Sequence, residues 1–258
     1  MRPLTEWQPR GIVGVFTDID DTLTTEGAIT ADALQALADL KAAGLHVIPI
    51  TGRPVGWSEP FAQSWPVDAI VAENGAVALL HEDGQALRKI YQQDATTRAS
   101  NFARMQQVLQ QIEREIPGAQ RSQDSPGRET DIAIDHSEFT HLPLAAIDVV
   151  VRAMQAAGMT ATVSSIHING WYGQHDKLAG ARWIVRELFG RDLDAELQRW
   201  VYVGDSTNDQ VMFAHFANSV GVANIRRFEA QLTHPPRFIA QSERGAGFSE
   251  VARLLTAP

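Results

Sequence analysis

The sequence contains no cysteine. This absence excludes disulfide bonds, a thiolate nucleophile and a metal site built on thiolate ligands, and it suits the interior of a cell. Long apolar runs are also missing: none approaches the roughly 18 residues that a membrane-spanning helix needs, and residues 1–10 lack the apolar core of a signal peptide. We therefore expect a cytoplasmic protein without a membrane partner.

Positive charge is scarce as well. The 22 Lys and Arg residues are outnumbered by 31 Asp and Glu residues, which leaves a formal net charge of −9 at pH 7. Nucleic acids require a basic surface, so they are not an expected partner, and a bound phosphate would depend on cations placed locally. Hydrophobic residues make up 44% of the 258 residues, enough for a large core in one domain or two. The oligomeric state stays unknown.

The most informative segment is residues 13–23, where an apolar, β-branched run ends abruptly in Asp18, Asp20 and Asp21. In an open α/β sheet, ligands bind at the carboxyl ends of the strands. Residues two apart on an extended chain point the same way, so Asp18 and Asp20 can face one reaction centre. The alternative is a solvated, Asp-rich turn.

The first and last parts of the chain alternate buried strands with helices. Apolar runs predict strands at residues 13–17, 45–50, 69–72 and 200–203, and a helix from Thr30 to Gly44 with Leu34, Leu37 and Leu40 on one face links the first two. Such alternation favours a parallel sheet with right-handed crossovers. We also expect an extended run at 76–80, a turn at 81–84, helices at 176–189, 208–217 and 248–255, and strands at 219–222 and 237–240.

The middle of the chain has a different pattern. An amphipathic helix is predicted at 97–116, a polar exposed loop at 118–128, alternating strands at 130–135 and 160–168, and a helix at 143–158. Half of the strand at 130–135 is expected to face solvent or a partner surface. We therefore expect a catalytic core of residues 1–84 and 173–258, and an inserted α+β domain of residues 85–172.

Four separate segments carry polar groups just after a strand or at a helix start: Asp18 to Thr22, Thr51 to Arg53, Asp176-Lys177, and Gly204 to Asp209. In a parallel sheet these segments lie on one edge, so four carboxylates would crowd together unless a cation intervenes. Mg²⁺ fits best, because carboxylate, carbonyl and water oxygens are its usual ligands. Lys177 could neutralise Asp18 or a bound phosphate, and the Thr51 hydroxyl and the amides near Gly52 could donate to phosphate oxygens. Taken singly, each could instead be a helix cap, a solvated lysine or an ordinary loop acid.

The order Asp18-x-Asp20-x-Thr22, Thr51-Gly52-Arg53, Lys177 and Gly204-Asp205-x-x-Asn208-Asp209 resembles the four motifs of the haloacid dehalogenase (HAD) superfamily of Mg-dependent phosphatases. The insertion resembles the type II cap of the branch with Cof-like sugar phosphatases, sucrose-phosphate phosphatase and mannosyl-3-phosphoglycerate phosphatase, in which Glu73-Asn74-Gly75 also recurs. The sequence departs from that branch at Asp21, where Gly is usual. The resemblance implies an α/β fold: a HAD-like Rossmannoid core with a parallel sheet flanked by helices, plus an inserted α+β cap domain.

The resemblance also implies roles for these residues. Asp18 would attack phosphorus to form an aspartyl-phosphate, and Asp20 would act as general acid and then as general base. Lys177 completes the catalytic set, and Mg²⁺ would be held by Asp18, the Asp20 backbone carbonyl, Asp205 and Asp209. Substrate contacts are expected from Thr51, Gly52, Arg53, Asn74 and Asn208, although Arg53 could instead only pair with a neighbouring acid. The implied activity is hydrolysis of a small-molecule phosphate ester, a sugar or glyceryl phosphate.

Other functions share parts of this pattern. A phosphomutase or phosphotransferase would pass the phosphoryl group to a second hydroxyl. A non-catalytic receiver-like module also combines clustered Asp with Thr or Ser and Lys, but it needs neither an acid two residues after the acceptor nor an inserted domain. A dinucleotide-binding oxidoreductase would need a Gly-x-Gly-x-x-Gly turn that the first strand lacks.

Some residues of the insertion have two possible roles. Polar residues on the strand at 130–135 and just before it could reach the substrate or form a solvated face, namely Arg128, Glu129, Asp131, Asp135 and His136. Those near the return to the core are expected to pack or to act as a hinge: His167, Trp171, Tyr172 and His175.

Overall fold

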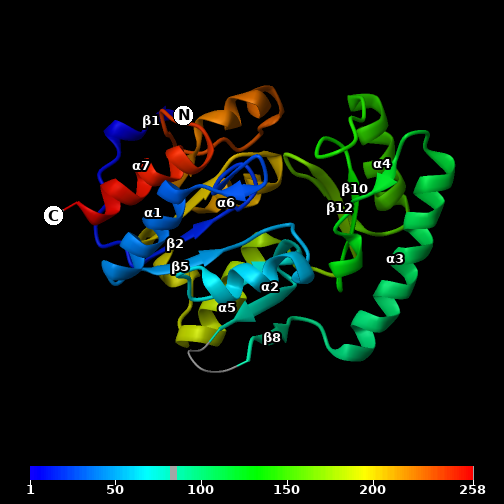
Figure 1. The fold of residues 1–258 in the computed structure, drawn as a ribbon, viewed down its shortest axis with the longest axis horizontal. Helices are drawn as coiled ribbons and strands as arrows, with labels where there is room; N and C mark the ends of the chain where they lie inside the picture. The colour runs from blue at the N-terminus through cyan, green and yellow to red at the C-terminus, as the bar shows by residue number, and fades with distance from the viewer. Residues whose placement is uncertain (82–85, 258) are drawn as a thin grey trace.

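The central sheet has six strands in the order β1-β15-β14-β13-β2-β5, and all of its pairings are parallel. We describe it from a computed structural model that covers residues 1–81 and 86–257. The strands are β1 (Arg2–Pro3), β2 (Gly14–Thr17), β5 (His46–Pro49), β13 (Trp200–Gly204), β14 (Asn218–Gly221) and β15 (Phe238–Ile239). Figure 1 shows this sheet with its helices in one half of the molecule and a second, smaller sheet in the other.

Both faces of the central sheet are buried, as the continuous apolar runs predict. Val15 and Val201 pack against α1 (Ala31–Ala42) and α7 (Arg244–Thr256). Phe16 and Tyr202 point to the opposite face, where they pack against α5 (Lys177–Phe189) and α6 (Gln210–His215). The helices expected at 176–189 and 248–255 are thus confirmed. The helix expected at 208–217 is shorter, because a 3₁₀ turn, η5 (Thr207–Asp209), precedes α6.

The first helix is confirmed, but its buried face differs from the expected one. Leu37 and Leu40 are fully buried beside Ala33 and Ala36, whereas Leu34 is 37% exposed. The buried stripe follows the 3.6-residue period through Ala33, and Leu34 lies outside it. Gly44 has φ of +79° and follows the helix, as expected.

A three-stranded antiparallel sheet continues beyond β5. It consists of β6 (Ile70–Ala72), β7 (Val77–Leu80) and β8 (Arg88–Tyr91), and a parallel bridge between Ile50 and Val71 joins it to the central sheet. The helix α2 (Val55–Ser64) follows β5. Except for His81, the expected turn at 81–84 lies outside the described residues, as does the expected domain boundary between 84 and 85. The division into two domains stays a prediction. The strand β8 follows the expected boundary in sequence but pairs with β7, which precedes it.

The second half of the molecule is an antiparallel sheet of four strands in the order β11-β12-β10-β9, packed against two helices (Figure 1). Met105, Leu109, Ile134 and Val150 belong to its core, which is separate from the two cores of the central sheet. The elements are α3 (Ala95–Glu115), β9 (Gln120–Arg121), β10 (Ile132–Asp135), α4 (Leu144–Ala156), β11 (Thr160–Val163) and β12 (His167–Trp171). The expected helices at 97–116 and 143–158 are confirmed.

The single strand expected at 160–168 is wrong. The chain forms two antiparallel strands there, because the Ser164 hydroxyl accepts hydrogen bonds from the amides of Ile166 and His167 at 3.3 and 3.0 Å and turns the backbone. Serine favours such local turns over an extended strand.

The exposure expected for residues 118–135 is also wrong in part. Ser122 and Arg128 are buried, as are all residues of β10 and Asp131 before it. A 3₁₀ turn, η3 (Ser125–Gly127), approaches α2 so closely that a Cβ on Gly56 would lie 2.9 Å from the Gly127 Cα. Arg128 and Asp131 therefore face the edge of the central sheet, whereas Gln120, Arg121 and Gln123 are exposed, as expected for the loop.

Several short elements were not predicted. A hairpin of β3 (Thr24–Thr25) and β4 (Ala28–Ile29) follows the Asp-rich segment, and its turn residues Glu26 and Gly27 have φ of +52° and +80°. Two positive φ values in succession are typical of a tight hairpin turn. The remaining short helices are η1 (Leu4–Glu6), η2 (Glu73–Gly75), η4 (Asp194–Arg199) and η6 (Ala223–Gln231). In the described part of the chain, no helix has the length and apolar character needed to cross a membrane.

Candidate active site

The four polar segments meet at one edge of the central sheet. Asp18 follows β2, Thr51 comes two residues after β5, and Asp205 follows β13. Because β13, β2 and β5 are neighbouring parallel strands, their carboxyl ends lie side by side. Lys177 is the first residue of α5, whose amino end the Asp176 carboxylate caps by accepting a hydrogen bond from the Ala179 amide at 2.7 Å.

Lys177 joins two of the acidic segments. Its Nζ donates hydrogen bonds to Asp18 Oδ1 at 2.6 Å and to Asp209 Oδ1 at 2.7 Å, and it lies 3.4 Å from the Tyr202 hydroxyl, which also bonds Asp209. Burial alone would lower the pKa of Lys177, but the two carboxylates outweigh it and raise that pKa above its ordinary value. The lysine is therefore a buried, permanent cation at the centre of the site.

Three buried carboxylates form what we call the carboxylate cluster: Asp18, Asp205 and Asp209. One oxygen of each lies within 4.8 Å of the others. Burial raises the pKa of Asp18 to about 7, and the negative charges of Asp209 and Asp20 add to this effect. The positive charge of Lys177 opposes it but does not outweigh it. Burial and the charges of Asp18 and Asp209 likewise raise the pKa of Asp205 well above its ordinary value. The single lysine does not neutralise this concentration of negative charge.

The hydrogen bonds of the cluster leave room for a cation. Asp209 Oδ2 accepts from the amides of Asp205 and Ser206 at 2.9 and 3.1 Å, which fixes its orientation. Asp205 Oδ2 accepts from Asn224 Nδ2 at 3.1 Å, whereas Asp205 Oδ1 is buried without a hydrogen-bond partner. A buried, unpartnered carboxylate oxygen is costly, and a hard divalent ion would satisfy it. The donor set of carboxylate oxygens fits the Mg²⁺ that the sequence predicts.

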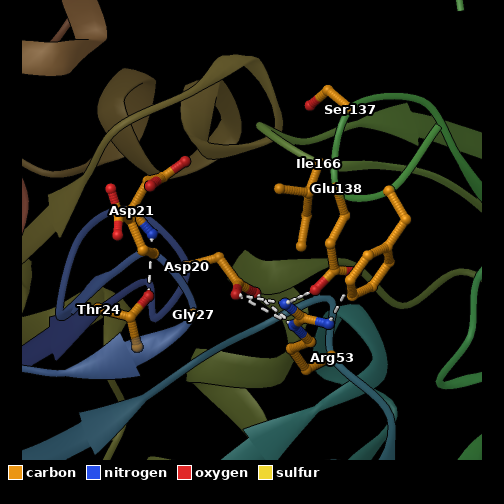
Figure 2. Close-up of a pocket in the computed structure, with 10 residues that line it drawn as sticks. Asp20, Asp21, Thr24, Gly27, Arg53, Ser137, Glu138 and Ile166 are labelled. Carbon is orange, nitrogen blue, oxygen red and sulfur yellow. Dashed lines mark hydrogen bonds and ion pairs between the residues drawn. The ribbon is translucent and has the colours of Figure 1, made fainter. Parts of the chain in front are cut away.

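Asp20 points away from this cluster towards Arg53. Its carboxylate accepts three hydrogen bonds from the guanidinium, two from Nε at 3.0 and 2.9 Å and one from Nη2 at 2.9 Å. Arg53 also bonds Glu138 at 2.7 Å and Asp124 at 3.1 Å, both from the second half of the molecule, as Figure 2 shows for Glu138. Burial alone would lower the pKa of Arg53, but Asp20 and Glu138 outweigh this effect and raise that pKa above its ordinary value. Of the two roles open to Arg53, the structure shows pairing with acids.

The loop after β5 meets the second half of the molecule. The Thr51 hydroxyl is buried and accepts a hydrogen bond from the Arg53 amide at 3.0 Å, so its own proton can still be donated. The Gly52 carbonyl accepts from Arg128 Nη1 at 3.0 Å and Asn169 Nδ2 at 3.2 Å. A Cβ on Gly52 would lie 3.2 Å from Asn169 Oδ1. Glycine is therefore the residue that lets this backbone pass so close to the side chain.

Two residues expected to bind substrate have other contacts. Asn74, in a left-handed conformation with φ of +54°, lies 3.4 Å from Asp131 through Nδ2. Asn208 Oδ1 accepts a hydrogen bond from the Ser206 hydroxyl at 2.9 Å, within the turn that orients Asp209. A substrate contact of either residue stays a prediction.

Asp21 shows why glycine is usual at its position. Its φ is +55°, a left-handed conformation in which Asp and Asn are tolerated better than most side chains. Its Oδ1 lies 3.0 Å from Arg244 Nε, and its carbonyl accepts a hydrogen bond from Asn224 Nδ2 at 2.9 Å.

Several residues of the site were missed. Tyr202 lies within a buried strand and carries no signal beyond its hydroxyl, which requires a partner. Asn224 lies shortly after β14, so the rule that ligands bind at strand ends could have found it. Glu138 and Asp124 lie in loops of the insertion, and no local pattern marks them.

The polar residues of the insertion divide into two groups. Arg128 reaches the core at Gly52, and Asp131, whose pKa burial raises to about 7, pairs with Arg128 at 2.7 Å. Asp135 instead accepts hydrogen bonds from the amides of residues 137–140 and so shapes the loop that carries Glu138. His167 also does more than pack, because its Nε2 lies 2.9 Å from Glu138 Oε2.

The other residues of the insertion that the sequence singles out make contacts away from the carboxylate cluster. Glu129 pairs with Lys89 at 2.8 Å, and His136 Nε2 lies 3.0 Å from the Ser164 carbonyl. Trp171 and His175 stack with ring centres 5.5 Å apart, which agrees with the expected packing role. Tyr172 donates its hydroxyl proton to the Ala157 carbonyl at 3.0 Å.

Two cavities open between the central sheet and the insertion. The first, of about 420 Å³, is lined by Asp20, Arg53, Glu138 and Phe139, and its polar side chains converge in Figure 2. The second, of about 530 Å³, includes Asp205. Asp21 lies between them and lines both. The two cavities therefore reach Asp20 and Asp205, and each is large enough for a small metabolite, whereas Asp18 and Lys177 line neither of them.

A family model described as haloacid dehalogenase-like hydrolase matches residues 15–121, which include the first two motifs. Over these residues the chain is similar to haloacid dehalogenase-like hydrolases. No curated protein matches it in sequence. Solved structures nevertheless share its fold along nearly its whole length.

Three of these structures illustrate the likeness. A protein of Thermoplasma acidophilum is 16% identical with a TM-score of 0.69, and the match covers 94% of this chain and 99% of that one. The sucrose-phosphatase of Synechocystis sp. PCC6803, solved with sucrose and phosphate, is 16% identical with a TM-score of 0.65, covering 93% and 96%. The HAD subclass IIB sugar phosphatase BT4131 is 15% identical with a TM-score of 0.64, covering 94% and 98%. At these identities the likeness shows the fold alone, an α/β fold with a six-stranded parallel sheet flanked by helices.

Proposed function

We propose that this protein is a Mg²⁺-dependent phosphatase of the haloacid dehalogenase (HAD) superfamily that hydrolyses a small phosphorylated metabolite, a sugar or glyceryl phosphate, through an aspartyl-phosphate. The observation that carries the proposal is the contact of Lys177 with both Asp18 and Asp209, beside Asp205. The names of the sucrose-phosphatase and of the subclass IIB sugar phosphatase support a phosphorylated sugar as the substrate class.

Asp18 is the proposed nucleophile. One of its carboxylate oxygens forms a bond to phosphorus while the bond between phosphorus and the leaving-group oxygen breaks, so the phosphoryl group passes to the enzyme. Lys177 supports this step because its ammonium, 2.6 Å from Asp18 Oδ1, favours the ionised carboxylate. The same charge would stabilise the negative oxygens of the transferring phosphoryl group.

Asp18, Asp205 and Asp209, with the Asp20 backbone carbonyl, would hold Mg²⁺. The unpartnered Asp205 Oδ1 supports this assignment. When bound, the ion would supply Lewis-acid stabilisation of charge on the phosphoryl oxygens. It would also relieve the repulsion between the three carboxylates, so that Asp18 is ionised at neutral pH.

Asp20 is the proposed acid and base. It gives a proton to the leaving-group oxygen, then takes one from the water that attacks the phosphorus of the aspartyl-phosphate. The bond between Asp18 and phosphorus breaks in this second step and inorganic phosphate leaves. Because Asp20 is bonded to Arg53, a leaving group must displace part of that contact. The Thr51 hydroxyl and the backbone near Gly52 are proposed to hold the phosphate, with Arg53, Asn74 and Asn208 as further contacts.

The proposal is tested by measuring inorganic phosphate released from a panel of sugar and glyceryl phosphates, with Mg²⁺ and with EDTA. Asp18→Asn keeps the size of the side chain but removes the nucleophile, so it should lower turnover by orders of magnitude, as should EDTA. Asp148→Asn, an exposed site on α4, is the matched control and should leave turnover unchanged. Turnover that survives both EDTA and Asp18→Asn would contradict the mechanism. Transfer of the phosphoryl group to a second sugar would indicate a phosphotransferase.

A further inference from the structure

The first cavity is the place for the leaving group, if the proposed function holds. Asp20 must touch the leaving-group oxygen to protonate it, and Asp20 lines this cavity together with Arg53, Glu138, Phe139 and Glu26. Figure 2 shows the Arg53 guanidinium between the Asp20 and Glu138 carboxylates. The groups that meet the leaving group are therefore largely acidic.

In the described part of the chain, every guanidinium that lines either cavity has a carboxylate partner. Arg53 bonds Asp20, Asp124 and Glu138. In the second cavity, Arg244 Nε lies 3.0 Å from Asp21 and Arg227 Nη2 lies 3.1 Å from Glu243. A second anionic group on the substrate would thus have to compete with a carboxylate for a cation.

Glu138 is the acid of the insertion most firmly fixed at this cavity. Oε1 accepts a hydrogen bond from Arg53 Nη2 at 2.7 Å, and Oε2 accepts from Arg53 Nη1 at 3.3 Å and contacts His167 Nε2 at 2.9 Å. Burial raises the pKa of Glu138, but the bonds to His167 and Arg53 outweigh it and lower that pKa below its ordinary value. Asp135 holds the loop by bonding the Glu138 amide at 2.9 Å.

The remaining binding capacity of Glu138 suits a hydroxyl group. A carboxylate offers about four acceptor positions, so the three contacts leave room for one more donor. Phe139 is 63% exposed at the rim of the same cavity and presents an apolar face. An acceptor beside an exposed aromatic ring suits the hydroxyl and C–H groups of an uncharged sugar or polyol.

We propose that Glu138 is a specificity-determining residue, which accepts a hydrogen bond from a hydroxylated, uncharged leaving group and repels one that carries a second anionic group. Given the proposed function, Glu138 would select neutral sugar or polyol phosphates over acid phosphates such as phosphoglycerates.

The test compares two esters of matched length, sorbitol 6-phosphate and 6-phosphogluconate, which differ in a terminal hydroxymethyl or carboxylate. We expect kcat/KM to favour sorbitol 6-phosphate by about tenfold or more in the wild-type protein. Glu138→Gln keeps the shape of the side chain and one acceptor but loses the charge. It should reduce the ratio of the two kcat/KM values by about tenfold. Glu138→Asp keeps the charge and should retain most of the preference, which controls for a fold defect.

A second control separates Glu138 from its partner Arg53. Asp124→Asn also removes a carboxylate from Arg53 but lies outside the first cavity, so it should leave the preference unchanged. An equal shift in Asp124→Asn would assign the effect to Arg53 and overturn the proposal. The proposal would also be overturned if the wild-type protein had equal kcat/KM values for the two esters, or if Glu138→Gln left their ratio unchanged.

Turnover of a third ester separates a failure of the proposed function from a failure of the role proposed for Glu138. p-Nitrophenyl phosphate serves as a general substrate. Its leaving group has neither a sugar hydroxyl nor a second anionic group, so its turnover reports the chemistry at Asp18 without the contact proposed for Glu138. If the matched esters are poor substrates, their inhibition constants against p-nitrophenyl phosphate measure the discrimination in binding instead. No turnover of any ester with Mg²⁺ would count against the proposed function, whereas turnover without discrimination would count against Glu138 alone.

Discussion

At the scale of single residues, the site combines burial, charge and backbone strain. Asp18 and Asp205 are carboxylates whose pKa values burial raises, and Lys177 is a buried cation that Asp18 and Asp209 hold in the charged form. Such groups persist because each is placed by a strand or a helix start that is itself firmly packed. The sequence identified these residues through their position after apolar runs. It could not identify Glu138 or Asp124, because their partner Arg53 lies 85 and 71 residues away in the chain.

Backbone strain at Asp21 is testable by itself. Asp21→Ala and Asp21→Gly both lose the contact with Arg244, so the two variants differ only in how they tolerate φ of +55°. The left-handed conformation is strained for alanine but not for glycine. Asp21→Ala should therefore be less stable than Asp21→Gly by about 1 kcal/mol. Urea unfolding of the two variants measures the difference. Equal midpoints at equal slopes would mean that the strand end relaxes around the substitution.

At the scale of elements, the position of Lys177 depends on how closely η2 approaches the start of α5. A Cβ on Gly75 would lie 2.2 Å from the Asp176 carbonyl oxygen, and one on Gly180 would lie 2.6 Å from the Gly75 Cα. The two glycines let backbone meet backbone, which brings the amino end of α5 to the edge of the sheet. Strand positions could be predicted from apolar runs alone, but this contact could not, because it depends on two segments about a hundred residues apart.

Gly75→Ala should therefore destabilise the protein more than a glycine change at an open site. Gly158 is a matched control, since it also has a positive φ, +79°, but nothing within 4 Å of its Cβ position. We expect Gly158→Ala to cost about 1 kcal/mol from strain, and Gly75→Ala to cost about 1–3 kcal/mol more from overlap with Asp176. Thermal and urea unfolding measure both. Equal losses would show that α5 can shift without cost.

At the scale of the whole molecule, the buried acids couple folding to pH and to the cation. The pKa values of Asp18 and Asp131 are raised to about 7 by burial, and the pKa of Asp205 is raised as well. At these three carboxyl groups the folded protein therefore binds protons more tightly than the unfolded chain between their ordinary pKa values and about 7, and we expect them to outweigh the opposite effect of His175, whose pKa burial lowers to about 4. Rising pH through that range should lower the free energy of unfolding.

In EDTA, the protein should thus unfold at a lower urea concentration at about pH 8 than at about pH 5. Mg²⁺ binds the deprotonated carboxylates of the folded state, so saturating Mg²⁺ should stabilise the protein more at the higher pH and reduce the difference. Asp205→Asn removes one ionisable group of the carboxylate cluster and should flatten the pH dependence in EDTA. A midpoint that rises from about pH 5 to about pH 8 without Mg²⁺ would contradict this account.

The sequence by itself determined the class of the fold and the catalytic candidates of the core. Both are encoded locally, since apolar runs mark buried strands and the polar residues directly after them must lie at one edge of a parallel sheet. Only the tertiary structure decided which face of α1 is buried, that residues 160–168 form parts of two strands, and that the polar side of β10 meets the core. It also decided the contacts of Arg53 with Glu138 and Asp124. The reason is physical: ion pairs between the two halves of the molecule depend on how these halves pack together, and no local pattern of residues records that arrangement.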